Sequence, residues 1–292
     1  MSHPPALSAS VPCCRALSCR ALAIAWLLIV LANSEGVADD EPAIDGNAEL
    51  AGLLDSVRQY EIRATKSDET LALHEPSLLN FTNPERNQER GSVFVWMHDE
   101  RPAAIGQFFR FGVRERRSTK HALHSLWPAP LEARFDGALA WAPEKPGINW
   151  QTFSGAPAPG LTHTNRLLQM RELARRFKLT LISPTDKSTE LRLSPRPLFD
   201  YSAPKSGITD GVIFSYVVAT DPEAILLIEA FDQKGETGFR YAFARFHFWR
   251  LTASEGERTV WDVEYDSNMA GNTFGNPVTL NRIYNSFHPR DE

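Results

Sequence analysis

Short runs of aromatic and β-branched residues with a period of two recur between residues 91 and 265, and they constrain the fold more than any other feature. The first three runs are 91–97 (GSVFVWM), 103–111 (AAIGQFFRF) and 120–126 (KHALHSL). The later runs are 178–183, 188–194, 211–220, 224–231, 239–251 and 258–265. Such runs, separated by turn residues, are typical of antiparallel strands. The sequence therefore predicts an α+β fold that is mostly β, with a large curved antiparallel sheet or a partly closed barrel.

Two segments have the three- and four-residue spacing of apolar positions that indicates an amphipathic helix. The first begins at Asn47, a residue type that caps helices well, and its pattern fades after Tyr60. The second covers residues 163–177 and places Leu167 and Met170 on one face. We expect both helices to pack on the sheet.

The hairpin around residues 232–238 can be assigned a register. Pairing Glu229 with Arg240 places an acid opposite a base, and the same register places Leu227 opposite Ala242, a large side chain opposite a small one. A slip of one residue would lose both matches. The long second strand of this hairpin carries aromatic residues on both faces, so we expect it to be central and covered on both sides.

All three cysteines lie in the first 20 residues, inside a segment that resembles a secretory signal peptide. Arginines precede twelve consecutive apolar residues at 21–32, and small residues follow. As a helix these residues would span about 18 Å, which is shorter than a hydrocarbon core of about 30 Å. We therefore predict that residues 1–38 are removed by cleavage after Ala38, with cleavage after Ser34 as the alternative. The protein is then exported, periplasmic or secreted, from a bacterium.

Removal of this peptide leaves a chain without cysteine, which excludes disulfides and thiol catalysis. The full chain has a net charge of -5 and is 42% hydrophobic, which excludes a polybasic nucleic-acid-binding chain and a disordered one. We expect no integral membrane segment after cleavage. The predicted organisation is an acidic leader (39–46), a single globular domain (47–265) without an internal repeat, and a docked irregular tail (266–292).

No strong catalytic signature occurs, such as a G-x-S-x-G elbow, an H-E-x-x-H zinc motif or a P-loop. Ser202–Lys205 matches S-x-x-K, but its proline disfavours the helix that this motif needs. His121 and His124 would point to opposite faces of a strand. Asp266 begins a calcium-like loop whose closing acid is replaced by Pro277. We therefore predict no catalytic residues, no metal site and no cofactor.

Polar residues within the aromatic strands are the best candidates for a binding site, because such groups are costly to bury without partners. The period of two would place Arg245 and His247 on one face of the run 239–251 together with Tyr241, Phe243 and Trp249, where they could line an aromatic cavity. The predicted ligand-binding residues are Arg110, Tyr241, Arg245, His247 and Trp249. The alternative is that the polar groups form structural ion pairs, such as Glu229 with Arg240.

The run GSVFVWMHDERPAAIGQFFRF at 91–111, followed by KHALHSL and by WAPEKPGINW, resembles a family of exported bacterial proteins with no assigned activity. The resemblance covers about residues 75–265. It supports export and a single domain, and it implies no catalytic or binding residues.

Together these features favour an exported binding or accessory protein that is not an enzyme. Its partner would be a small organic or sugar ligand and not a nucleic acid, and its oligomeric state stays open. One alternative is a hydrolase that acts on envelope or environmental polymers through acid–base groups such as Glu229 and His247. The other is a cell-envelope scaffold or interaction protein, for which a large exposed apolar patch is the expected sign.

Overall fold

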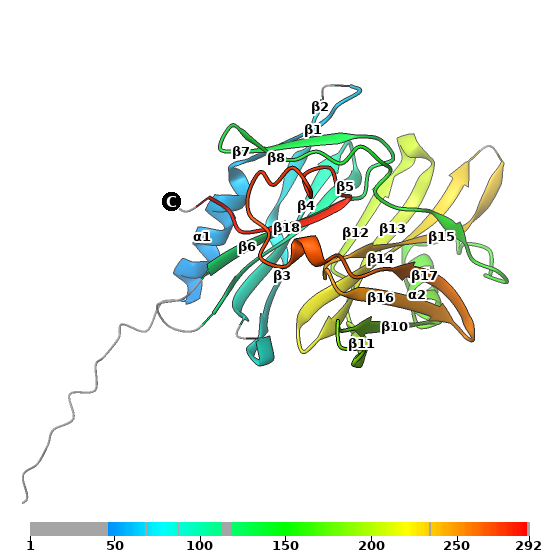
Figure 1. Cartoon of the computed structure of the whole chain (residues 1–292). Helices are drawn as coiled ribbons and strands as arrows, with labels where there is room; N and C mark the ends of the chain where they lie inside the picture. Colours follow the sequence, from blue (N-terminus) through cyan, green and yellow to red (C-terminus); the bar gives the residue numbers. More distant parts are fainter. Residues whose placement is uncertain (1–45, 68, 87, 113–117, 234, 291–292) are drawn as a thin grey trace, which may run out of the picture. The chain divides into compact units, whose positions relative to one another are not determined.

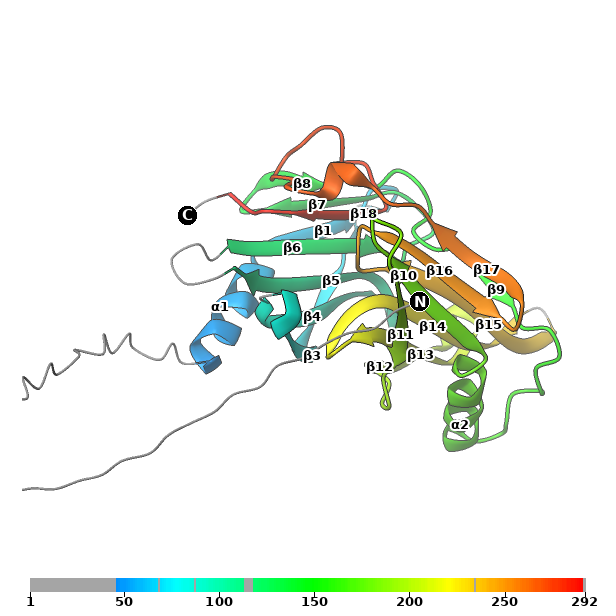
Figure 2. The ribbon, with the colours of Figure 1, turned by 60° about the horizontal axis from the view of Figure 1, so that its bottom comes forward.

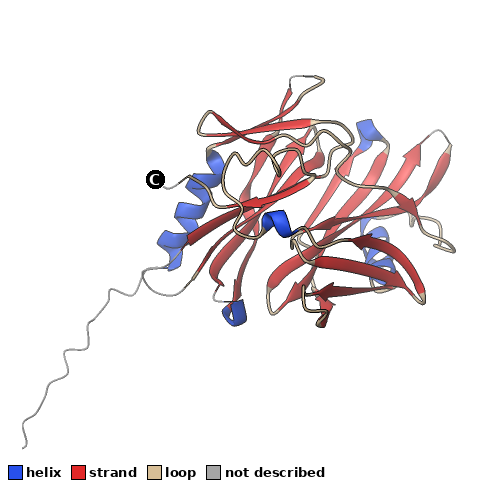
Figure 3. Ribbon diagram, viewed as in Figure 1, coloured by secondary structure: helices blue, strands red, loops and turns tan. Residues whose placement is uncertain are grey.

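The fold is α+β and mostly β, with curled antiparallel sheets and helices packed on them, as the sequence predicts (Figures 1 and 3). The computed structural model describes residues 46–67, 69–86, 88–112, 118–233 and 235–290. The predicted signal peptide and residues 39–45 of the predicted leader lie outside this part. Within it, no helix is both long enough and apolar enough to cross a bilayer.

The chain passes twice through the same series, one helix followed by antiparallel strands. The first series is α1 (Gly46–Arg58), β1 (Tyr60–Ala64), β2 (Glu69–Thr70), β3 (Ala72–Asn83), β4 (Gln88–His98), β5 (Arg101–Phe111), β6 (Ser118–Ser125), β7 (Leu131–Phe135) and β8 (Ala138–Trp141). The second is α2 (His163–Ala174), β10 (Phe177–Ile182), β11 (Ser188–Leu193), β12 (Phe199–Ala203), β13 (Ile208–Val218), β14 (Asp221–Gln233), β15 (Glu236–Arg245), β16 (Arg250–Glu255) and β17 (Arg258–Val263). The remaining elements are the strands β9 (Gln151–Thr152) and β18 (Tyr284–Phe287) and the 3-10 helices η1 (Pro84–Arg86), η3 (Pro204–Ser206) and η4 (Ser267–Met269).

These two series are structural repeats, which we call repeat 1 (46–141) and repeat 2 (163–263). From β3 to β8, a residue of repeat 1 corresponds to the residue 120 positions later. The matched residues include the pairs Phe81 and Tyr201, Pro84 and Pro204, Gly91 and Gly211, and Pro102 and Pro222. Both β4–β5 and β13–β14 turn through a residue with positive φ, 51° at Asp99 and 52° at Ala219.

The strand register is repeated as well. Phe94 lies opposite Gly106 in the first repeat, and Phe214 lies opposite Leu226 in the second. Both hairpins shift register at equivalent places, after Trp96 and after Tyr216. The chain thus contains an internal duplication. The pattern of the sequence did not indicate it, because the identical residues are scattered.

Each repeat places its helix on its own sheet. Strands β18-β6-β5-β4-β3 form one sheet of repeat 1, and β2-β1-β7-β8 form another. In repeat 2 the order β17-β16-β10-β11-β13-β14-β15-β9 is continuous, with β12 added to β13. Helix α1 contacts β1, β4 and β5, while α2 contacts β13 and β14 (Figure 2). The predicted packing of both helices on sheet is confirmed.

The two repeats share a third hydrophobic core in addition to one core each. Strand β5 contacts β12, and β14 contacts β3, which is the reciprocal arrangement expected of a pseudo-twofold pair. The shared core contains Phe81, Val93, Ile105, Tyr201, Ile213 and Ile225, among others. These six residues form three equivalent pairs in the two repeats. The described residues accordingly form one compact unit.

The predicted hairpin register is confirmed, but the predicted strand 239–251 is wrong. Glu229 lies opposite Arg240 and Leu227 opposite Ala242. The strand ends at Arg245, the chain bends over residues 246–249, and β16 then begins. The Arg245 guanidinium donates to the carbonyls of residues 247, 249 and 264, at 2.8, 2.8 and 3.0 Å, and so holds the bend.

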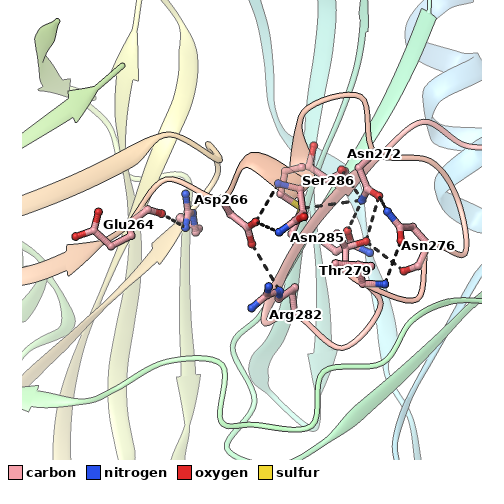
Figure 4. Close-up of polar contacts among 12 residues, drawn as sticks. Glu264, Asp266, Asn272, Asn276, Thr279, Arg282, Asn285 and Ser286 are labelled. Carbon is pink, nitrogen blue, oxygen red and sulfur yellow. Dashed lines mark hydrogen bonds and ion pairs between the residues drawn. The ribbon is translucent and has the colours of Figure 1, made fainter. Parts of the chain in front are cut away.

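The C-terminal residues are held against repeat 1 by backbone pairing and by side-chain amides. Strand β18 adds to the edge of β6. The Asn272 amide donates to Asn285 (2.9 Å) and to the carbonyl of Ser286 (3.1 Å), and its oxygen accepts from Asn276 and Thr279 (Figure 4). These contacts explain why a segment rich in asparagine is ordered here.

Candidate functional site

A pocket of about 330 Å³ lies where repeat 1, repeat 2 and the C-terminal segment meet. Its walls are largely aromatic: Phe109, Phe111, Phe246, Phe248, Trp249 and Tyr284. Its charged or titratable lining residues are Arg86, Lys120, Asp221, Glu223 and His247. An apolar pocket with a few convergent polar groups is typical of a small-molecule site.

Two buried carboxylates, Asp221 and Glu223, project from the start of β14 and are 2% and 1% exposed. Asp221 accepts hydrogen bonds from Gln107 Nε2 at 2.6 Å and from Asn83 Nδ2 at 3.1 Å. Arg86 Nη1 donates to Glu223 Oε1 at 2.7 Å and lies 3.7 Å from Asp221 Oδ2. Two acids thus share one guanidinium, and the Asp221 oxygens are the better satisfied.

Burial changes the protonation of this acid pair. It raises the pKa of Asp221 to about 6, although the hydrogen bond from Asn83 and the charge of Arg86 act in the opposite direction. Burial, and then the charge of Asp221, raise the pKa of Glu223 well above its ordinary value. The pair can therefore retain a proton under mildly acidic conditions, and it can serve as a hydrogen-bond donor as well as an acceptor.

His247 lies in the bend after β15, and its ring is held by the backbone. The N–H of Trp249 donates to His247 Nδ1 at 2.9 Å, so the neutral ring carries its hydrogen on Nε2. Burial and the charges of Arg86, Arg245 and Lys120 lower the pKa of His247 well below its ordinary value. The residue is therefore a neutral imidazole at physiological pH.

Lys120 supplies a buried ammonium group to the same pocket. The residue is 7% exposed, and its Nζ donates to the carbonyl of Met269 at 3.3 Å. Nζ also lies 5.4 Å from the centre of the Phe248 ring. Burial lowers the pKa of Lys120 to about 8. Among the described residues, Lys120 has no carboxylate as an ion-pair partner.

The structure brings together two of the five predicted ligand-binding residues, His247 and Trp249. Arg245 is occupied by backbone carbonyls and lines a different, larger pocket of about 720 Å³. Tyr241 is buried in the core of repeat 2, and its hydroxyl donates to a glutamine of β9. Arg110 faces α1, where its Nη1 lies 3.8 Å from Glu49.

Sequence reasoning missed Lys120, Asp221 and Glu223. A signal for the acids was present, because DPE opens an otherwise apolar strand and the period of two places both acids on one face. Lys120 stands at the start of KHALHSL, where its burial depends on the C-terminal segment. Nothing local in the sequence indicates that contact.

Glu229, in contrast, is closed in a structural cluster. Its carboxylate accepts from Arg101 (2.8 and 3.0 Å), from Arg240 (2.7 Å) and from the Tyr201 hydroxyl (2.8 Å), and the residue is fully buried. The ion pair with Arg240 is therefore confirmed. Both oxygens are engaged, so Glu229 is not available to act with His247 as an acid–base pair, as the hydrolase alternative supposed.

The residues considered for metal binding have other partners. His121 Nδ1 forms a hydrogen bond with the Tyr60 hydroxyl, and His124 Nδ1 donates a hydrogen bond to the carbonyl of Ser125, both at 2.8 Å. Asp266 accepts from the backbone of residue 268 and so caps η4. In the part of the chain that the structure describes, no three His, Cys, Asp or Glu side chains are grouped to hold a metal ion.

No family model, curated protein or solved structure matches this chain.

Proposed function

We propose that the protein is an exported binding protein that takes a small organic ligand into the pocket between the repeats. The observation that carries the proposal is the placement of buried charged groups within aromatic walls. The volume of about 330 Å³ is at the lower end of the range of small-molecule pockets. The ligand is then about the size of a substituted aromatic ring or a monosaccharide. Export is proposed from the signal-peptide pattern of residues 1–38.

The chemistry of the pocket favours binding over a purely structural role. Charges buried in a protein interior are costly unless they are paired, and the closed cluster around Glu229 shows how this chain pairs them. The pocket instead keeps polar groups beside a space that a ligand can fill. Trp249 and Phe248 line this space, with Arg86 over the Trp249 ring and His247 stacked on Phe248, so a ligand ring would pack against aromatic side chains that already adjoin polar groups.

The test is a binding screen by thermal shift and isothermal titration calorimetry. The probes are phenylacetate, phenylacetamide, 2-phenylethylamine and a set of monosaccharides. We expect at least one probe to bind wild-type protein and Trp249→Ala to weaken it at least tenfold. Trp261→Ala, which removes an indole from the larger pocket, is the matched control and should leave affinity unchanged. Binding lost in the Trp261 variant and kept in the Trp249 variant would place the site elsewhere.

A hydrolase is the second candidate function, and Asp221 and Glu223 favour it. Buried acids with raised pKa values next to a neutral imidazole are the groups that general acid–base catalysis uses. Hydrolysis of 4-nitrophenyl esters or glycosides, abolished in Glu223→Gln with the fold intact, would favour this function. The absence of turnover throughout such a panel would count against it.

A further inference from the structure

The duplication allows the pocket to be compared with its equivalent in the other repeat. The cluster around Glu229 lies at the position of repeat 2 that matches the part of the pocket lined by Phe109 and Lys120 of repeat 1. Glu229 lies opposite Arg240 in β14–β15, and the equivalent residues Phe109 and Lys120 lie opposite each other in β5–β6. Arg240 and Lys120 are thus the same cation position in the two repeats. Only one of them has an acid as its cross-strand neighbour.

The other members of the closed cluster are also changed in the pocket. Tyr201, which donates to Glu229, is replaced by Phe81, and Arg101 is replaced by Asp221. Phe109 in place of Glu229 removes the carboxylate, and Phe81 in place of Tyr201 removes its hydroxyl donor. A cation therefore remains at Lys120 where the anion of the equivalent cluster is missing.

Asp221 does not replace that missing anion. Its oxygens accept from Gln107 and Asn83, and Arg86 lies beside them. Glu223 is likewise held by Arg86. Lys120 keeps a single carbonyl as hydrogen-bond partner among the described residues, so two of its three N–H donors are free to bind an acceptor.

We infer that the ligand carries a carboxylate and that this carboxylate binds Lys120, as the Glu229 carboxylate binds Arg240 in the equivalent cluster. The inference rests on the binding function proposed above. The apolar body of the ligand then lies against the aromatic walls of the pocket. Lys120 is the residue that selects an anion over a neutral or cationic ligand of the same shape.

Three probes of nearly equal shape test this selection by calorimetry at pH 7: phenylacetate, phenylacetamide and 2-phenylethylamine. We expect wild-type protein to bind the carboxylate at least tenfold more tightly than the amide, and the amine most weakly. Lys120→Met, which retains the length of the side chain without its charge, should remove the preference. Lys120→Arg should retain it. Far-UV circular dichroism checks that both variants are folded.

Two outcomes would overturn the inference alone. One is that the amide or the amine binds as tightly as the carboxylate, while Trp249→Ala still weakens the binding of these probes. The other is that Lys120→Met keeps the preference for the carboxylate. If none of the three probes nor any monosaccharide binds wild-type protein, the proposed binding function falls, and the inference falls with it.

Discussion

At the scale of single residues, the difference between the two repeats comes down to a few exchanges at matched positions. Glu229 closes one cluster with three donors, whereas Phe109 at the equivalent position leaves Lys120 without an acid. A buried charge without a partner is costly, and this cost is why we propose Lys120 as a binding group and Glu229 as a structural one. The same backbone therefore supports a packed junction in one place and a pocket in the other.

His124 provides a residue-scale prediction about stability and pH. Burial lowers its pKa to about 3, from an ordinary value of 6.5 that the unfolded chain would have. A lowered folded-state pKa means that its stabilisation is complete above pH 6.5 and is lost as the pH falls toward 3. Compared with His124→Asn, wild-type protein should lose about 1.4 kcal/mol of unfolding free energy per pH unit below 6.5. Urea unfolding at several pH values measures this, and a constant difference between the two proteins would contradict it.

At the scale of elements, the periodicity of the sequence predicts both helices and most of the strands from β4 onward, and it predicts the β14–β15 register correctly. Local alternation of apolar residues is enough to predict these elements, and acid–base matching is enough to predict the register. The periodicity does not predict β1, β3 or β12. The end of β15 could not be predicted this way, because the bend is held by Arg245 bonds to three carbonyls, one of them distant in sequence. That error placed Arg245 and Tyr241 in a cavity with His247. In the structure Arg245 lines the larger pocket and Tyr241 lies in the core of repeat 2.

The contact between β12 and β13 gives an element-scale prediction. The ring of Tyr201 approaches Gly211 closely, as the ring of Phe81 approaches Gly91 in repeat 1. A Cβ on Gly211 would overlap with this ring. Gly211→Ala should therefore lower the unfolding free energy by about 1–3 kcal/mol, the usual cost of overpacking. Ser202→Ala, on the exposed face of β12, is the control, and equal stabilities of the two variants in urea titration would contradict the packing described.

At the scale of the whole molecule, the sequence predicts the fold class but not the duplication. Some equivalent residues, such as Phe81 and Tyr201 or Lys120 and Arg240, share size or charge but not identity. The pocket depends on that duplication and on a C-terminal strand, so it could not be found from strand patterns alone. Asp221 and Glu223 could have been identified from the sequence, because both lie on one face of β14.

The core shared by the repeats predicts how the molecule unfolds. Because β5 packs on β12 and β14 on β3, neither repeat buries its apolar surface without the other. We expect tryptophan fluorescence and far-UV circular dichroism to report a single coincident urea transition. Two separate transitions would show that the repeats are independently stable.

The central claim, that the pocket between the repeats binds a carboxylate through Lys120, is tested most directly by a crystal structure with 4-bromophenylacetate. The anomalous signal of bromine locates the ring without ambiguity. The account predicts bromine among the aromatic walls near Trp249, with the carboxylate within hydrogen-bond distance of Lys120 Nζ. Bromine in the larger pocket beside Trp261, or a carboxylate directed away from Lys120, would contradict it.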